Sequence, residues 1–154
     1  MPVKILVDAD ACPVKEEIYR VARRHGLPVV VVANSPMTVP AVDSITLDVV
    51  SGRFDAADDH IVARADAGDV VVSNDVPLAA RCLAKGAWAL SPSGRRFTED
   101  SIGDDVATRD LMAHLRDGGK VSGGPPPFGP RDRSRFLDQL EATIRAARRA
   151  VPDR

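Results

Sequence analysis

The stretch ILVDADACPVKEEI, residues 5–18, runs an apolar strand into two carboxylates, a cysteine and a proline, and then into a helix. The segment VKILVD (3–8) is a short, nearly continuous apolar run, and so is PVVVVA (28–33). Such runs are typical of strands that are covered on both faces. Between them, Pro13 suits the first turn of a helix whose apolar residues recur at helical spacing, and Gly26 suits its end. We therefore predict a β-α-β unit at the start of the chain.

The spacing of apolar residues keeps switching between the strand and the helix pattern along the rest of the chain. Further strands are expected at 45–50, 69–75 and 87–90, and further helices at 55–67, 76–85, 100–116 and 132–150. A turn or short hairpin with a basic tip is expected at SPSGRRFT (91–98), and a Gly- and Pro-rich loop at 118–130. This pattern predicts one domain over residues 1–154, an α/β three-layer sandwich with a mostly parallel central sheet.

The amino-acid composition is also consistent with a single α/β domain. The 154 residues are 44% hydrophobic but only 4% aromatic, which suits a core of Val, Ala and Leu. No run approaches the roughly 20 apolar residues of a membrane-spanning helix, and the N-terminus lacks a basic segment followed by an apolar one. Cys12 and Cys82 have no paired spacing, so neither a disulfide framework nor a zinc site is predicted. We expect a cytoplasmic protein that is not attached to a membrane.

Charge is divided unevenly along the chain. The formal net charge of -1 gives no overall attraction to nucleic acid or membrane. Residues 1–80 carry 7 Lys and Arg against 12 Asp and Glu, whereas residues 81–154 carry 14 against 10. The acidic half suggests cation binding and the basic half suggests a polyanion, although a solvated surface explains both.

Acidic residues lie where strands are expected to end. Asp8 and Asp10 follow the first strand, Asp75 ends another, and Asp58 and Asp59 lie in the first turn of a helix. The ligand crevice of an open parallel sheet lies beyond the carboxyl ends of its strands, so these carboxylates converge if the two strands are neighbours. For each residue alone, a helix cap or a favourable helix-dipole interaction is the simpler alternative.

Clustered carboxylates repel one another unless a cation lies among them. A set of oxygen ligands without His or Cys selects a hard divalent ion such as Mg²⁺ or Mn²⁺. The cluster therefore predicts a metal.

Five segments stand in a recognisable order: VDADACPVKEEI (7–18), GRFDAADDHIV (52–62), GDVVVSNDVPLAARCLAKGA (68–87), LSPSGRRFTEDSI (90–102) and GGPPPFGPRDRSRFLDQL (123–140). Together they closely resemble the bacterial YaiI/YqxD family over essentially the whole chain. That family looks like a branch of the PIN-like superfamily, whose members include metal-dependent ribonucleases and flap-type nucleases. The resemblance implies a PIN-like fold and a metal-dependent nuclease that cleaves RNA phosphodiesters.

The resemblance also implies roles for particular residues. Asp8 is similar to the first-strand acid of the superfamily, Asp58 or Asp59 to its helix acid, and Asp75 to the acid of its S-x-D strand end, in which Ser73 is the small hydroxyl residue. The expected catalytic residues are Asp8, Asp58 and Asp75 from this resemblance, and Asp10 from its place beside Asp8. The implied metal ligands are Asp8, Asp58, Asp59 and Asp75. The expected substrate-binding residues are Ser73, Asn74, Arg95 and Arg96, the two arginines because phosphate contacts supply most sequence-independent affinity for nucleic acid. The Mg²⁺ or Mn²⁺ would activate a water and offset charge on the phosphoryl oxygens.

Several points stay open at this stage. Asp10 is either a direct ligand or a group that accepts hydrogen bonds from metal-bound water. A fourth superfamily acid is not singled out among Asp100, Asp104 and Asp105. The last helix, which suits the core, suits a homodimer contact equally well. The number of metal ions and the choice between endo- and exonucleolytic cleavage are not determined by the sequence.

Two other classes of function remain. One is a non-catalytic RNA-binding or interaction protein on the same fold. The other is a haloacid-dehalogenase-like phosphatase, because DAD after an apolar strand resembles the D-x-D motif of a nucleophile and a general acid. Against the phosphatase, Pro13 starts a helix at once, where those enzymes place a loop and a flap.

Overall fold

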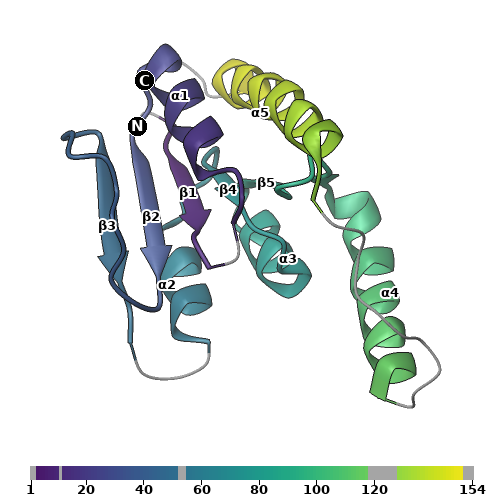
Figure 1. Cartoon of the computed structure of the whole chain (residues 1–154). Coiled ribbons are helices and arrows are strands. Elements are labelled where there is room, and N and C mark those ends of the chain that lie inside the picture. Colours follow the sequence, from purple (N-terminus) through teal and green to yellow (C-terminus); the bar gives the residue numbers. More distant parts are fainter. Residues whose placement is uncertain (1–2, 11, 52–54, 118–127, 151–154) are drawn as a thin grey trace.

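The computed structural model describes residues 3–10, 12–51, 55–117 and 128–150. A six-stranded sheet in the order β3-β2-β1-β4-β5-β6 forms the centre of the fold (Figure 1). The strands are β1 (Ile5–Asp8), β2 (Val29–Ala33), β3 (Ile45–Val49), β4 (Val70–Val72), β5 (Trp88–Leu90) and β6 (Arg96–Phe97). The helices are α1 (Lys15–His25), α2 (Ala56–Arg64), α3 (Val76–Ala84), α4 (Glu99–Asp117) and α5 (Pro130–Ala150). All strand pairs are parallel except β5 with β6.

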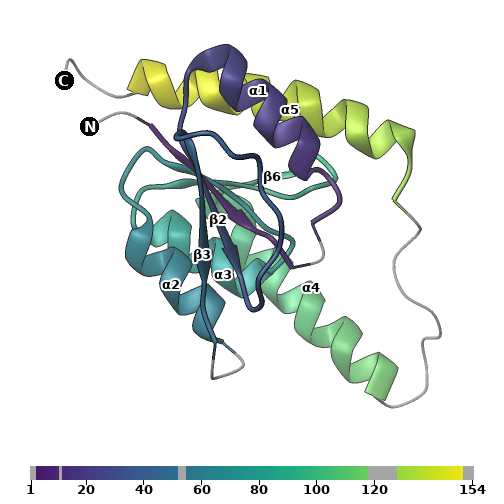
Figure 2. The ribbon, with the colours of Figure 1, turned by 60° about the vertical axis from the view of Figure 1, so that its left-hand side comes forward.

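The two faces of the sheet are covered by different helices. Side chains alternate between the faces of a strand, so Ile5 and Val7 of β1 pack with α1 and α5, whereas Leu6 packs with α2 and α3. Figure 2 shows α1 and α5 together on one side of the sheet and α2, α3 and α4 on the other. The predicted α/β three-layer sandwich with a mostly parallel sheet is confirmed.

Some predicted boundaries were wrong. The first helix begins at Lys15 rather than at Pro13, and α2 ends at Arg64 instead of continuing to Ala67. The last helix begins at Pro130, because proline suits a first helical position and the Asp132 carboxylate accepts the N–H of Gly129 at 2.9 Å. The predicted loop therefore ends before Pro130, and its residues 118–127 lie outside the described part of the chain. None of the helices in that part is long and apolar enough to cross a membrane.

The turn between β5 and β6 packs tightly against α5. Gly94 has φ +91°, and a Cβ atom built there would lie 2.6 Å from Cγ and 2.7 Å from the backbone carbon of Arg135. Only glycine avoids both the unfavourable φ and this overlap. The turn and α5 can therefore approach backbone to backbone.

Replacing Gly94 with alanine is expected to lower the free energy of unfolding by about 2 kcal/mol, from overpacking and a strained φ. The matched control is Gly103 in α4, where an added Cβ meets nothing within 4 Å and φ is not positive. Gly103→Ala should instead raise stability by about 0.5–1 kcal/mol, since alanine is the better helix former. Urea denaturation of both variants checks the pair, and equal effects would contradict this account of the turn.

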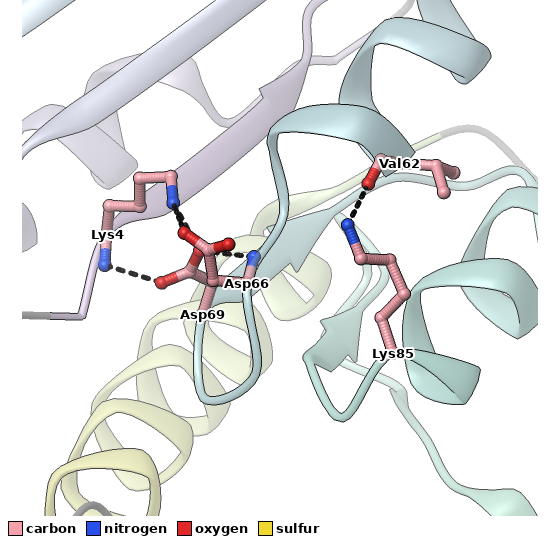
Figure 3. Close-up of polar contacts among 5 residues, drawn as sticks. All are labelled: Lys4, Val62, Asp66, Asp69 and Lys85. Atoms are coloured by element: carbon pink, nitrogen blue, oxygen red, sulfur yellow. Dashed lines mark hydrogen bonds and ion pairs between the residues drawn. The ribbon is translucent and has the colours of Figure 1, made fainter. Parts of the chain in front are cut away.

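At the amino edge of the sheet, a buried carboxylate ties β1 to the loop before β4 (Figure 3). The side chain of Asp69 is 3% exposed and accepts the Lys4 ammonium at 2.6 Å. It also accepts two backbone N–H groups, from Lys4 at 3.2 Å and from Asp66 at 2.8 Å. In the same view, the Lys85 ammonium donates to the carbonyl oxygen of Val62 at 2.6 Å and so joins α3 to α2.

Candidate functional site

The carboxyl ends of β1 and β4 meet at the centre of the sheet, where the strand order reverses. Val7 of β1 is paired with Val72 of β4, so Asp8 and Ser73 lie side by side just beyond them. The Ser73 hydroxyl donates to Oδ2 of Asp8 at 2.8 Å. In an open α/β sheet this reversal point is where a ligand crevice forms. The condition on which the predicted site depended, that the two strands are neighbours, is met.

Asp75 is held in place by the turn from β4 into α3. Its backbone N–H donates to the Ser73 hydroxyl at 3.0 Å, and its Oδ1 accepts the N–H of Leu78 at 3.0 Å. This is an N-cap interaction, so the capping alternative is confirmed for one of the two carboxylate oxygens. Asn74, predicted to bind substrate, is exposed in the same turn.

The acidic residues act on one another electrostatically. Burial raises the pKa of Asp8 to about 6, the hydrogen bond from Ser73 opposes this rise, and the charges of Asp58, Asp10 and Asp75 add to it. Burial also raises the pKa of Asp58, with a further rise from Asp75 and a partial offset from Arg81. Asp8, Asp58 and Asp75 therefore form one electrostatic cluster across the ends of β1 and β4 and the start of α2.

The donor chemistry of this cluster fits a hard divalent cation, because every candidate ligand is a carboxylate oxygen. Within the described ranges, however, no three His, Cys, Asp or Glu side chains lie close enough together to hold a metal ion. Carboxylates repel one another when no cation lies between them. The metal site remains a prediction.

Asp10 lies in the loop between β1 and α1, on the exposed side of the cluster. Its Oδ2 accepts the backbone N–H of Asn34, after β2, at 3.3 Å. Lys15 closes this loop, since its ammonium donates to the carbonyl oxygens of Cys12 at 2.8 Å and of Ala9 at 3.5 Å. Sequence reasoning missed Lys15, although a lysine in a first helical turn opposes the helix dipole and so signals another role.

Cys12 is buried in the core beneath this loop. Burial raises the pKa of its thiol, so it behaves as a packed apolar residue and not as a reactive thiolate.

Asp59, predicted to be a metal ligand, is paired with Arg81 of α3 at 3.0 Å. The next residue, His60, is paired with Asp48 of β3 at 2.8 Å, and Arg64 donates to the same carboxylate at 2.7 Å. These contacts fasten α2 to its neighbours and hold Asp58 at the edge of the sheet. Neither Arg81 nor Asp48 was singled out from the sequence, and nothing in the local pattern marks them.

The two arginines predicted to bind substrate already contact other parts of the protein. Arg95 is paired with Asp105 of α4. Arg96 lies over the Trp88 ring, 5.5 Å from its centre, and donates to the Thr143 hydroxyl at 3.1 Å.

Of the three candidates for a fourth acid, Asp105 forms an ion pair with Arg95. Its other oxygen is buried and has no hydrogen-bond partner among the described residues. Asp100 and Asp104 are exposed on α4. None of the three is among the acids that most raise the pKa of Asp8.

The fold and this edge define an α/β protein with a cluster of carboxylates at the reversal point of its sheet. The chain belongs to the YaiI/YqxD family, since the family model described as "Uncharacterized BCR, YaiI/YqxD family" matches residues 6–146. It is 55% identical over 149 residues to a UPF0178 protein of Rhodopseudomonas palustris (strain BisB18), covering 97% of this chain and 96% of that relative. A UPF0178 protein of Paramagnetospirillum magneticum is 51% identical over 149 residues, 97% and 99% of the two chains. No solved structure matches the chain.

Proposed function

We propose that this protein is a divalent-metal-dependent nuclease that cleaves RNA phosphodiesters. The observation that carries the proposal is the electrostatic cluster of Asp8, Asp58 and Asp75 at the reversal point of the sheet. The raised pKa values of Asp8 and Asp58 mark a concentration of negative charge that a divalent cation would stabilise. The likeness to PIN-like nucleases supports the same reading of the acids.

Each residue has a distinct part in this proposal. Ser73 fixes the carboxylate of Asp8 through its hydroxyl, and Asp75 keeps one oxygen for a ligand while the other caps α3. Asp58 completes the set, and Asp10 lies near enough to raise the pKa of Asp8. Bound there, Mg²⁺ or Mn²⁺ would activate a water molecule and neutralise charge that develops on the phosphoryl oxygens.

The structure disfavours a haloacid-dehalogenase-like phosphatase. That chemistry needs a loop and a flap after the D-x-D motif, whereas α1 begins at Lys15 and the loop before it is closed by the Lys15 ammonium. A non-catalytic RNA-binding protein would use the same fold without cleavage. Metal binding and RNA cleavage, measured on the same samples, separate these functions.

The test is a calorimetric titration of Mn²⁺ into chelator-stripped wild type and Asp75→Asn, followed by incubation of both with single-stranded and structured RNA. Asparagine caps a helix as well as aspartate does, so the variant keeps its fold and loses one charged ligand. We expect Mn²⁺ affinity to fall about 10-fold or more, and cleavage to fall with it. Asp66→Asn, an exposed acid at the opposite edge, is the control and should change neither.

The outcomes separate cleanly. Mn²⁺ binding and cleavage that are both lost in Asp75→Asn support the nuclease. Binding that is lost without any cleavage by the wild type assigns a non-catalytic role to the site. Equal Mn²⁺ affinity in wild type and Asp75→Asn removes the acidic cluster from consideration as a metal site.

A further inference from the structure

Arginines gather at one end of the layer formed by α1 and α5. The two helices run parallel, since Arg133 near the start of α5 donates to the carbonyl of Pro13 while Arg148 near its end donates to that of His25 (Figure 2). Their last turns therefore lie together at the amino edge of the sheet, away from the acidic cluster. Four arginines lie in these last turns and two more lie about one turn earlier. Together they are called the arginine face below: Arg20, Arg23, Arg24, Arg145, Arg148 and Arg149.

The arginine face holds more positive charge than its own acids neutralise. Glu141 contacts Arg24, His25 at 2.8 Å and Arg145 at 3.7 Å, so one carboxylate serves several cations. Glu141 and Asp138 line a shallow hollow of about 360 Å³ together with Arg145 and Arg149. The pKa of His25 is lowered by burial and by the charges of Arg148, Arg24 and Arg145, which is the effect of a positive field.

Three members of the face are free to bind something else. Arg20, Arg23 and Arg149 are exposed and have no hydrogen-bond or ion-pair partner among the residues that the structure describes. A favourable interaction with a helix dipole accounts for Arg23 and Arg149, which lie in last turns, but not for Arg20 in the middle of α1.

We propose that the arginine face binds the phosphate backbone of a nucleic acid strand. Arginine presents a planar fork of donors that matches phosphate oxygens, and phosphate contacts supply most sequence-independent affinity for nucleic acids. An anionic membrane is the competing polyanion, but a membrane-binding face also inserts apolar side chains. The large exposed apolar residues of the described chain are Val42, Val49 and Leu111, and none of them lies on α1 or α5.

The inference deepens the proposed function and rests on it for the choice of RNA as the strand. A cluster of carboxylates repels phosphates, so an RNA that reaches Asp8 must gain its affinity from another surface. The 11 residues of α1 span roughly 16 Å between the loop that carries Asp10 and the arginine face. An RNA whose phosphates bind the arginine face can extend from there past the acidic cluster at the carboxyl ends of β1 and β4.

The test measures RNA binding in the presence of EDTA, so that no metal-dependent cleavage takes place. The probe is a fluorescein-labelled oligouridylate of about 20 nucleotides, longer than typical single-strand binding sites, and the readout is fluorescence anisotropy across a range of salt concentrations. The variant is Arg20→Gln/Arg23→Gln/Arg149→Gln. The control, Lys85→Gln/Arg109→Gln, removes exposed positive charge from the other side of the sheet, at two side chains that contact no acid of the candidate site.

We expect the Kd of the test variant to rise about 10-fold or more. The slope of log K against log salt concentration should fall by about 2, at about 0.7 per lost phosphate contact. The control variant should bind like the wild type. A test variant with wild-type affinity and slope, an equal loss in the control, or a wild type that does not bind the probe would each overturn the inference.

Two further arms separate the alternatives. If phosphatidylserine vesicles bind the wild type but not the test variant, while both bind RNA equally, the face is a membrane surface and the inference fails. In EDTA, Asp75→Asn should bind the probe at least as tightly as the wild type does, because the variant lacks one of the charges that repel phosphate. If that variant also keeps its Mn²⁺ affinity while the arginine variant loses RNA, the nuclease proposal fails and the RNA-binding face stands.

Discussion

Asp8→Asn is expected to make the protein more stable at pH 8 and, at the same time, to weaken its response to Mn²⁺. The pKa of Asp8 is raised from an ordinary 3.8 to about 6, chiefly because burial disfavours the ionised form. At pH 8 the folded state must carry this charge beside Asp58, Asp10 and Asp75. Asparagine keeps the shape and the acceptor for Ser73 but removes the charge.

The pH dependence follows from the direction of the shift. Between about pH 4 and pH 6 the unfolded chain has lost the Asp8 proton while the folded chain retains it, so stability falls as the pH rises through this window. Below about pH 4 both states are protonated, and asparagine should make little difference. At pH 8 we expect Asp8→Asn to be more stable by about 1–2 kcal/mol, after a discount for the solvent exposure of the carboxylate.

If the proposed metal site is correct, a divalent ion should reverse the order of stability of the wild type and Asp8→Asn. A ligand that binds only the folded state at 100 times its Kd adds about 2.7 kcal/mol, and the wild type should gain this on addition of Mn²⁺ while Asp8→Asn gains far less. RNA cleavage should fall at least about 100-fold in the variant, as when an essential charged group is removed. Thermal unfolding at pH 4 and pH 8, with EDTA and with Mn²⁺, measures the differences in stability, and incubation with RNA measures the loss of cleavage.

The control is Asp10→Asn, because that side chain is exposed and should change stability by less than about 0.5 kcal/mol at either pH. If Asp8→Asn is less stable than the wild type at pH 8 in EDTA, Asp8 is a structural residue. That result would remove the electrostatic argument for the metal site.

The layered fold was predictable because its signals are local. Two strands covered on both faces read as apolar runs, and the helices between strands carry an apolar stripe at helical spacing. Boundaries were less predictable, since α2 stops at Arg64 where Ala65 turns to extended backbone, and no helix-ending residue marks that point. The order β2-β1-β4 was not predictable either, because several strand orders are compatible with the same alternation of strands and helices.

The candidate site was predictable to the extent that it sits at strand ends. Asp8 and Asp75 follow apolar strands, and the rule for parallel sheets brings such residues together. The groups that hold them were not predictable, because Ser73 meets Asp8 across 65 residues and Arg81 meets Asp59 across 22. Such pairs depend on how helices lie on the sheet, and a single sequence carries no signal for them.

At the opposite edge, Asp69→Ala is expected to lower the free energy of unfolding by about 3–5 kcal/mol, the usual cost of removing one member of a buried ion pair. The carboxylate accepts three hydrogen bonds, and two of them come from backbone N–H groups of Lys4 and Asp66 that would lose their partner (Figure 3). Small domains are stable by about 5–15 kcal/mol, so the loss is a large share of the total.

Three further variants separate charge from backbone hydrogen bonding. Lys4→Met leaves Asp69 with both backbone donors, so it should cost less than Asp69→Ala, about 1–2 kcal/mol. Asp69→Asn keeps a hydrogen-bond acceptor but loses the charge. Its cost in free energy of unfolding should lie between those of Lys4→Met and Asp69→Ala. Asp66→Asn should cost less than about 0.5 kcal/mol, because its side chain is 64% exposed and its ion pair with Lys4 lies in water.

The readout is urea denaturation at pH 7, with the double variant Lys4→Met/Asp69→Asn closing a thermodynamic cycle. A positive coupling of about 1 kcal/mol or more is expected for a charge pair in contact with little solvent around it. If Asp69→Ala costs no more than Asp66→Asn, then the buried carboxylate does not hold β1 to the loop before β4. The amino edge of the sheet would in that case be held by backbone pairing and apolar packing alone.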